Sequence, residues 1–267
     1  MSGRDELYRD RETRPGSFRF DEQVVDVFPD MIDRSVPGYS LVVPMIGQLA
    51  RRYVQPDSTV HDLGCSLGAV ILSIRSALLA DDDRSGVRLV ATDNAPAMVR
   101  RLAKRLGETE IPHRVSGADV EPAGPSPGAA AGPLPVELVC GDIQDTTIDD
   151  ASFVALNFTL QFLGLEGRDR LLTRVAEGLR PGGVLVLAEK VCFEDAGTQA
   201  RQTDWHHDYK RLQGYSDLEI ARKRTALEAV LVSETESAHR ERLARCGFAR
   251  VTRWFQCFGF CAWLAER

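Results

Sequence analysis

Asp62-Leu63-Gly64-Cys65-Ser66-Leu67-Gly68 is the stretch that decides the fold expected for this chain. An apolar run at Val60 precedes it, and the helical pattern Ala69-Val70-Ile71-Leu72-Ser73-Ile74 follows it. A later apolar run, Val87 to Thr92, ends at Asp93. Strand, glycine turn, helix, strand and acid form the unit from which an open α/β sheet builds a nucleoside site beyond its strand ends. We therefore expect a ligand that contains a ribose.

The glycines of this turn narrow the class of ligand. Gly64 and Gly68 supply backbone without Cβ atoms, which a turn that passes beneath a ligand needs. The dinucleotide fingerprint G-x-G-x-x-G is not met, because Ser66 and Ala69 occupy its second and third glycine positions. Pyrophosphate binding is therefore disfavoured.

Two acids suit S-adenosylmethionine better. Asp62 stands two positions before the first glycine, where a carboxylate can meet the ammonium of the amino acid end. Asp93 can accept hydrogen bonds from the two ribose hydroxyls. The alternative is a turn in a ligand-free α/β domain. The glycine turn and the distal acid occur together at the right separation, which favours the nucleoside site.

Length and charge exclude some classes of function. A chain of 267 residues with 43% hydrophobic and 27% charged residues can bury one large core, so one catalytic domain with insertions is expected. The 33 basic and 39 acidic residues give a net charge of −6, which disfavours a broad phosphate-binding surface. Direct tight binding to tRNA or DNA is not expected.

The cysteines and the start of the chain indicate the compartment. No C-x-x-C pair occurs, so neither a metal site nor a disulfide framework is predicted, and buried thiols in a reducing compartment are expected. Residues Met1 to Arg14 are charged throughout, and no apolar run approaches membrane-spanning length. We expect a cytoplasmic protein that does not bind membranes.

The chain divides into two predicted parts. Residues 1–56 form a helical N-terminal and lid segment, in which a helix is interrupted at Pro29 and Arg34 to Tyr39 form an ordered loop. Residues 57–267 form a Rossmann-like domain. Within it, 116–135 is expected to be a flexible surface insertion, because fourteen of its twenty residues are Gly, Pro or Ala.

The rest of the domain predicts further strands and a cap. A charge-rich helical cap is expected at 200–232. Two strand ends fall on the ligand-bearing edge: one continues into Asp142 and Ile143, and the other ends at Asn157. The sequence therefore predicts an α/β fold with a doubly wound, mostly parallel sheet. Strands are expected at Val136–Cys140, Phe153–Leu156, Val184–Ala188 and in a closing hairpin from Phe248 to Leu264.

The order of these strand ends resembles class I S-adenosylmethionine-dependent methyltransferases, which implies a seven-stranded sheet. More specific motifs, spread over nearly the whole chain outside the insertion, are similar to the carboxy-S-adenosylmethionine synthase family. They are Phe20-Asp21-Glu22, Val27-Phe28-Pro29-Asp30-Met31-Ile32, Arg34-Ser35-Val36-Pro37-Gly38-Tyr39-Ser40, Leu156-Asn157-Phe158-Thr159-Leu160-Gln161-Phe162-Leu163, His206-His207-Asp208, Gly214-Tyr215-Ser216 and Trp254-Phe255-Gln256-Cys257-Phe258. The chain departs from the family in its insertion, at Gly259, where Asn is frequent, and at Cys261.

The resemblance implies carboxylation of the methyl group of S-adenosylmethionine, with prephenate as the carbon dioxide source and phenylpyruvate as the by-product. The product, carboxy-S-adenosylmethionine, serves a second enzyme that modifies the wobble uridine of tRNA, and the family is homodimeric. Arg224 and Tyr39 would have the catalytic roles. The family's ligand contacts fall on Tyr39, Gly64, Cys65, Ser66, Asp93, Asn94, Asp142, Ile143, Asn157 and Arg224.

Arg224 offers a physical test of this resemblance. A guanidinium about 5 Å from a sulfonium costs roughly 3 kcal/mol at an effective dielectric near 20. A conventional methyltransferase gains nothing from that repulsion, whereas a carboxylate on the methyl carbon would form a charge-assisted pair with the arginine. The structural alternative for Arg224 is a solvated charge on an amphipathic helix. A conventional small-molecule methyltransferase and a non-catalytic tRNA-docking protein are the rival functions.

Overall fold

The computed structural model describes residues 3–9, 20–80, 85–121, 133–228 and 230–267. Within them the helices are α1 (Glu22–Ser35), α2 (Tyr39–Tyr53), α3 (Ala69–Leu79), α4 (Pro96–Glu108), a 3-10 turn η1 (Leu160–Phe162), α5 (Leu165–Gly178), α6 (Ala196–Leu212), α7 (Asp217–Glu228) and α8 (Glu236–Arg245). The strands are β1 (Thr59–Leu63), β2 (Arg88–Asp93), β3 (His113–Gly117), β4 (Val136–Cys140), β5 (Ala151–Asn157), β6 (Leu179–Cys192), β7 (Glu234–Thr235), β8 (Arg250–Cys257) and β9 (Phe260–Glu266).

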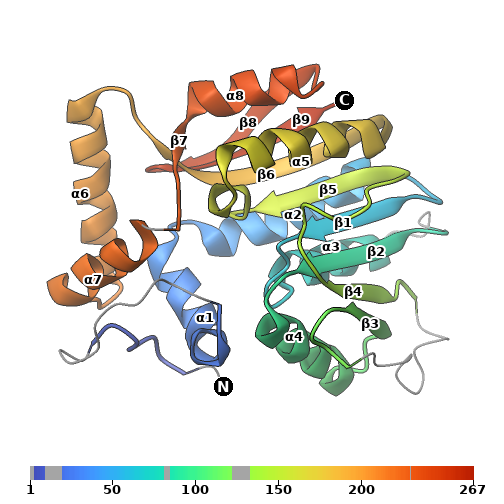
Figure 1. Ribbon diagram of the computed structural model, residues 1–267, viewed down its shortest axis with the longest axis horizontal. Helices are drawn as coiled ribbons and strands as arrows, with labels where there is room; N and C mark the ends of the chain where they lie inside the picture. Colours follow the sequence, from blue (N-terminus) through green and yellow to red (C-terminus); the bar gives the residue numbers. More distant parts are fainter. Residues whose placement is uncertain (1–2, 10–19, 81–84, 122–132, 229) are drawn as a thin grey trace.

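One twisted sheet forms the centre of the molecule, with the strand order β3-β4-β2-β1-β5-β6-β9-β8 (Figure 1). All pairs from β3 to β6 are parallel, and the hairpin of β8 and β9 closes the sheet in antiparallel pairing. From β1 the chain first builds strands on one side, and later on the other. Such a switch point opens a crevice at the carboxyl ends of the central strands.

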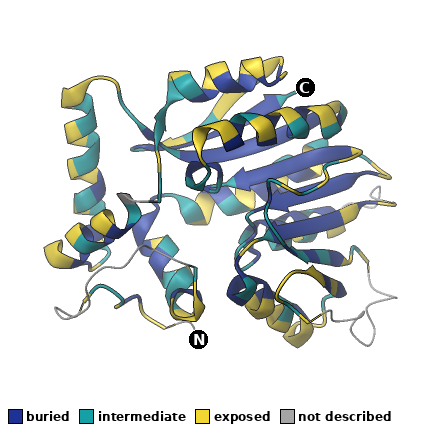
Figure 2. Ribbon diagram, viewed as in Figure 1, coloured by how far each residue is buried: buried dark blue, intermediate teal, exposed yellow. Residues whose placement is uncertain are grey.

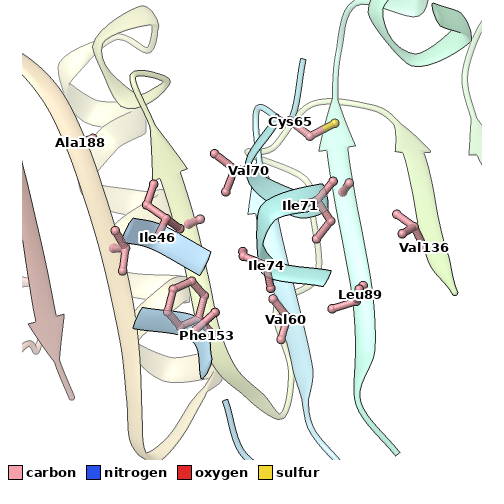
Figure 3. Packing of buried hydrophobic residues seen from close by; sticks show 14 of the residues in the cluster. Ile46, Val60, Cys65, Val70, Ile71, Ile74, Leu89, Val136, Phe153 and Ala188 are labelled. Atoms are coloured by element: carbon pink, nitrogen blue, oxygen red, sulfur yellow. The ribbon is translucent and has the colours of Figure 1, made fainter. Parts of the chain in front are cut away.

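Helices cover both faces of the sheet because its central strands are apolar on both sides. In β5, Phe153 and Ala155 belong to the core cluster beneath α2, α3 and α4, whereas Val154 and Leu156 belong to the cluster beneath α5 and α8. Figure 2 shows the central strands of the sheet as buried and the outer helix faces as exposed. Figure 3 shows the first cluster, where Ile46 of α2 and Ile74 of α3 lie above Phe153 and the neighbouring strands.

A third, smaller cluster supports the elements that lie beyond the strand ends. Val24, Val25 and Met31 of α1 pack with Met98 of α4 and Ala226 of α7. In Figure 1, α1, α6 and α7 lie to one side of the sheet, beyond the tip of β5. These helices therefore face the edge at which the parallel strands end.

The predicted doubly wound, mostly parallel α/β fold is confirmed, with more strands than the seven expected. Within the described residues, β3 adds an edge strand beside β4, and the two residues of β7 pair with the end of β6. The strand β3 was missed because its residues His113 to Gly117 carry only a weak alternation of buried and exposed side chains. The division of the chain at residues 56 and 57 stays a prediction.

Two local predictions about the N-terminal segment are wrong. The helix α1 runs through Pro29 without a break, because the packing of buried Val24, Val25 and Met31 holds it on both sides of the proline. Tyr39 does not lie in a loop but is the first residue of α2, behind Gly38, whose φ of +81° makes the turn.

The structure describes the predicted cap at 200–232 almost completely, and the predicted insertion at 116–135 only in part. The cap region contains two helices, α6 and α7, with Gly214 at a φ of +85° between them. Of the predicted insertion, residues 122–132 lie outside the described residues, and its first two residues, Ser116 and Gly117, end β3. No helix among the described residues is long and apolar enough to cross a membrane.

Replacing Phe153 with alanine tests the role of the first core cluster. Its side chain is fully buried between helices and sheet, so the change should lower the free energy of unfolding by about 3–5 kcal/mol, measured by urea titration. Leu212→Ala is the control, because a side chain that is 83% exposed should change stability by less than about 0.5 kcal/mol. Equal effects of the two changes would contradict the described packing.

Candidate active site

The turn after β1 brings the backbone close to the crevice. Gly64 has a φ of +81°, and a Cβ at this position would lie 2.3 Å from Cγ2 of Thr159 and 2.9 Å from its Cβ. Rotation of the Thr159 side chain about its Cα–Cβ bond does not move the Thr159 Cβ, so it cannot relieve this contact. Glycine is therefore required here both by the torsion angle and by the close approach of the loop that follows β5.

Asp93, at the end of β2, fixes this turn. One carboxylate oxygen accepts a hydrogen bond from the backbone N–H of Ser66 at 2.8 Å, and the other accepts one from the N–H of Ala95 at 2.9 Å. Each oxygen keeps a further acceptor position for a ligand hydroxyl. Burial raises the pKa of the Asp93 carboxyl above its usual range.

Asp62 lies beneath the same turn and is almost completely buried, with a relative exposure of 1%. Its Oδ2 accepts a hydrogen bond from the N–H of Ile71 in the first turn of α3, at 3.0 Å. Burial raises the pKa of the Asp62 carboxyl to about 7, against the hydrogen bond from Ile71, and the charge of Asp93 adds to the rise. A cationic ligand group would favour its ionised form.

The ends of β4 and β5 complete this edge. Asp142 follows β4, and its Oδ1 accepts a hydrogen bond from the N–H of Gln144 at 2.8 Å; the neighbouring Ile143 is buried. Asn157 ends β5, and among the described residues its buried Oδ1 has no hydrogen-bond donor. A buried acceptor without a donor indicates a position that a ligand N–H or O–H can satisfy.

Tyr39 and Cys65 line the same cavity without being chemically activated. Burial, followed by the charge of Asp62, raises the pKa of the Tyr39 hydroxyl. Burial and the charges of Asp93 and Asp62 raise the pKa of the Cys65 thiol well above its usual value. Both groups therefore stay protonated at neutral pH, and the Cys65 thiol is not a thiolate nucleophile.

A single cavity of about 770 Å³ brings together all ten predicted ligand contacts. Gly64, Asp93, Asp142 and Asn157 reach it from the sheet edge, and Tyr39 reaches it from α2. Helices α6 and α7 supply the far wall. These ten residues are Tyr39, Gly64, Cys65, Ser66, Asp93, Asn94, Asp142, Ile143, Asn157 and Arg224.

Arg224 holds a different position from the other nine. It lies on α7, is exposed, and lines both this cavity and a shallow pocket that His207 and Arg211 share on the outside of the cap. Its charge contributes to lowering the pKa of the His207 imidazole, after burial and Lys210. Arg224 is therefore at the rim of the cavity, and its contact with a ligand stays a prediction.

An ion pair that the sequence analysis missed attaches the cap to the start of the chain. The ammonium of Lys223 lies 3.0 Å from Oδ2 of Asp5, and it donates hydrogen bonds to the hydroxyls of Ser35 at 2.8 Å and Tyr215 at 3.1 Å. Lys223 and Asp5 are both buried. Because the pair spans 218 positions, no local pattern could have predicted it.

Glu189 is a second residue whose role the sequence did not indicate. Its carboxylate is completely buried and accepts hydrogen bonds from the N–H groups of Leu160 at 2.9 Å and Gln161 at 3.0 Å. Burial raises its pKa to about 8, against the charge of Arg168 and these N–H donors. Glu189 therefore holds the loop after Asn157.

Comparison with known proteins now defines the family. A carboxy-S-adenosyl-L-methionine synthase from Salmonella paratyphi C is 46% identical over 260 residues, which cover 97% of this chain and 95% of that protein. The chain belongs to the carboxy-S-adenosyl-L-methionine synthase family. The protein of that name from Klebsiella pneumoniae has the same identity and coverage. A family model described as a methyltransferase domain matches residues 61–187 of this carboxy-S-adenosyl-L-methionine synthase family member.

Solved structures support the fold alone. An O-methyltransferase family protein from Burkholderia thailandensis gives a TM-score of 0.59 at 15% identity, with 93% of this chain and 60% of that chain covered. Human N-acetylserotonin methyltransferase gives 0.55 at 16% identity, with 92% of this chain covered. The chain spans 55% of the length of the human protein. The carboxy-S-adenosyl-L-methionine synthase family thus shares the methyltransferase architecture.

Gly64→Ala tests the close approach at the turn. We expect a loss of about 1–3 kcal/mol in the free energy of unfolding, because the new Cβ meets Thr159 and the φ of +81° disfavours alanine. Gly164→Ala is the matched control, since a Cβ there has nothing within 4 Å, and it should change stability by less than about 0.5 kcal/mol. Urea unfolding of both variants gives the comparison; a neutral effect at Gly64 would refute the described geometry.

Proposed function

We propose that this protein converts S-adenosyl-L-methionine and prephenate into carboxy-S-adenosyl-L-methionine, phenylpyruvate and water. The observation that carries the proposal is the near full-length identity of 46% to proteins named carboxy-S-adenosyl-L-methionine synthase. The geometry of the cavity supports it independently. Its sheet edge offers buried acceptors for a cationic nucleoside, and its far wall carries several basic side chains.

The proposed ligand contacts follow from the described geometry. Asp93 would accept the ribose hydroxyls while it holds the turn through Ser66. Asn157 would satisfy its buried Oδ1 with a donor of the ligand. Asp62 would balance the ammonium of the methionine end, which explains why this carboxyl stays buried beneath the turn.

The reaction can proceed without a strong protein base. The positive sulfur acidifies the C–H bonds of its methyl group. Prephenate loses carbon dioxide and its hydroxide as its ring becomes aromatic, and the hydroxide takes a methyl proton to give water. The resulting ylide carbon then forms a C–C bond to the carbon dioxide. The protein orients the partners and excludes water, which would reprotonate the ylide.

Arg224 and Tyr39 are the residues that we propose to act at the methyl group. The Arg224 guanidinium would pair with the new carboxylate, which offsets its repulsion from the sulfonium. Tyr39, at the start of α2, would close the cavity over the ligand as a neutral hydroxyl, consistent with its raised pKa.

The oligomeric state, the compartment and the use of the product are also proposals. We propose that the protein acts as a homodimer in a reducing cytoplasm and passes its product to a tRNA carboxymethyl-transferring enzyme. The six cysteines are free, which agrees with a reducing compartment. The net charge of −6 supports transfer of a small molecule rather than direct tRNA binding.

Mass spectrometry of the nucleoside product tests this function. Protein incubated with S-adenosyl-L-methionine and prephenate should yield a nucleoside that has gained one carboxyl group, together with phenylpyruvate. Arg224→Leu should lower this yield at least about tenfold, because one charge-assisted pair is lost. Arg201→Leu, an exposed arginine on α6 outside the cavity, is the control and should retain activity.

Two outcomes would count against the proposal. A methylated acceptor in place of the carboxylated nucleoside would identify a conventional methyltransferase. Full activity of the Arg224→Leu variant would show that Arg224 does not act on the ligand.

Asp62 predicts a pH dependence of S-adenosyl-L-methionine binding. With a pKa of about 7 in the free protein, the carboxyl is protonated below this pH and cannot pair with the ammonium. Affinity should therefore rise from pH 5.5 to pH 7.5, measured by calorimetry. Asp62→Asn should weaken binding and flatten this rise, whereas Asp26→Asn, at an exposed position, should leave it unchanged. A pH-independent wild-type affinity would contradict the proposed pairing.

A further inference from the structure

The cavity also contains a group of polar side chains, from α6, α7 and the end of β6, that the nucleoside site does not use. We call it the basic recess, and it consists of Lys190, Gln202, His206, Lys210 and Lys223. Three of these residues lie four positions apart on α6, so they share one face of that helix. His206 orients this face inward, because its Nε2 lies 2.8 Å from the backbone oxygen of Ser35 at the end of α1.

Lys210 is the unusual member of the recess. It is 7% exposed, and within the described part of the chain its ammonium forms no ion pair and donates no hydrogen bond. The neighbouring Lys223 differs, because its ammonium pairs with Asp5 and donates to two hydroxyls. The acid of this region is thus already paired, and Lys210 is left facing the cavity with its charge uncompensated.

The buried position of the Lys210 ammonium is energetically unfavourable in the protein without a ligand. Burying an ammonium without a counter-ion is unfavourable, and the charges of Lys223 and Lys190 add repulsion. Burial first, and then these two lysines, lower the pKa of the Lys210 ammonium to about 7. An anion in the recess would remove the penalty, because it supplies the missing counter-charge.

A second polar group points to the same kind of ligand. Gln202 lines the cavity one helical turn from His206, and its buried Oε1 has no hydrogen-bond donor among the described residues. The recess therefore combines a cation without a counter-ion and an acceptor without a donor. A molecule with carboxylate and hydroxyl groups satisfies both requirements.

We propose that the basic recess binds the dicarboxylate substrate, and that Lys210 pairs with one of its two carboxylates. This inference rests on the function proposed above, in which that substrate is prephenate. The recess and the acids of the sheet edge line the same cavity, and most of the recess comes from the cap helices α6 and α7. Cationic nucleoside and dianionic partner are thereby assigned to different parts of one cavity, with the reacting methyl group between them.

Binding to the full-length protein tests the proposal without turnover. The protein is saturated with S-adenosylhomocysteine, which has no methyl group to carboxylate, and prephenate is titrated in by calorimetry. Lys210→Met should weaken prephenate binding at least tenfold, and Lys210→Arg should restore a large part of it. Lys104→Met, at a side chain that is 68% exposed and outside the cavity, should bind like the wild type.

Two further measurements separate a binding role from a structural one. The Lys210→Met variant should bind S-adenosylhomocysteine with an affinity within about twofold of the wild type. Its thermal midpoint without ligand should be equal or higher, because a buried charge without a partner is replaced by an apolar chain of similar length. In steady-state assays its KM for prephenate should rise at least tenfold, and its KM for S-adenosyl-L-methionine should not.

The outcomes are distinguishable from failure of the proposed function. Absence of a carboxylated product from the wild-type protein would overturn the function itself. A carboxylating wild type whose Lys210→Met variant binds prephenate unchanged would overturn only the role of Lys210. A lower thermal midpoint with unchanged prephenate affinity would assign Lys210 to the support of the cap, against the proposal.

Discussion

The close approach of the loop after β5 to the turn after β1 is the constraint on which the site depends. Gly64 leaves no room for a side chain beside Thr159, so these two strand ends are held at a fixed separation. Asp93 then ties the turn to the next strand through Ser66. Glu189 holds the loop from the other side by its bonds to Leu160 and Gln161. Contacts within the protein therefore hold the carboxyl ends of the central strands in place without a ligand.

The two walls of the cavity have opposite electrical character. Asp62 and Asp93 lie at the sheet edge, and burial disfavours the charge of each. Lys210 and Lys223 lie on the cap helices, where burial likewise disfavours charge. Acidic groups at the sheet edge and basic groups on the cap helices thus line one cavity. Such an arrangement favours a pair of substrates with opposite charges over either one alone.

The sequence predicted the parts of the site that depend on local pattern. Asp93, Asp142 and Asn157 each follow an apolar strand, and parallel strands bring such ends to one edge, so their convergence could be foreseen. The straight path of α1 through Pro29 could not, because packing on α4 and α7 overrides the propensity of proline to break a helix. The prediction of a loop at Tyr39 was also wrong, because the turn at Gly38 lets α2 begin at Tyr39 itself.

The basic recess shows the limit of this approach more clearly. Lys210 and Lys223 look like ordinary charges on amphipathic helices, and only their burial distinguishes them from solvated lysines. Burial depends on where α6 and α7 lie relative to α1, which no motif encodes. The role of Gln202 depends on the same placement.

The pairing of Asp5 with Lys223 makes the cap depend on a segment that is distant along the chain. The two residues lie 218 positions apart, and both are buried. Loss of the Asp5 carboxylate would leave the Lys223 ammonium buried without its counter-ion, which is strongly unfavourable. The wall of the cavity that α7 supplies is therefore sensitive to changes in a segment that lies outside the sheet.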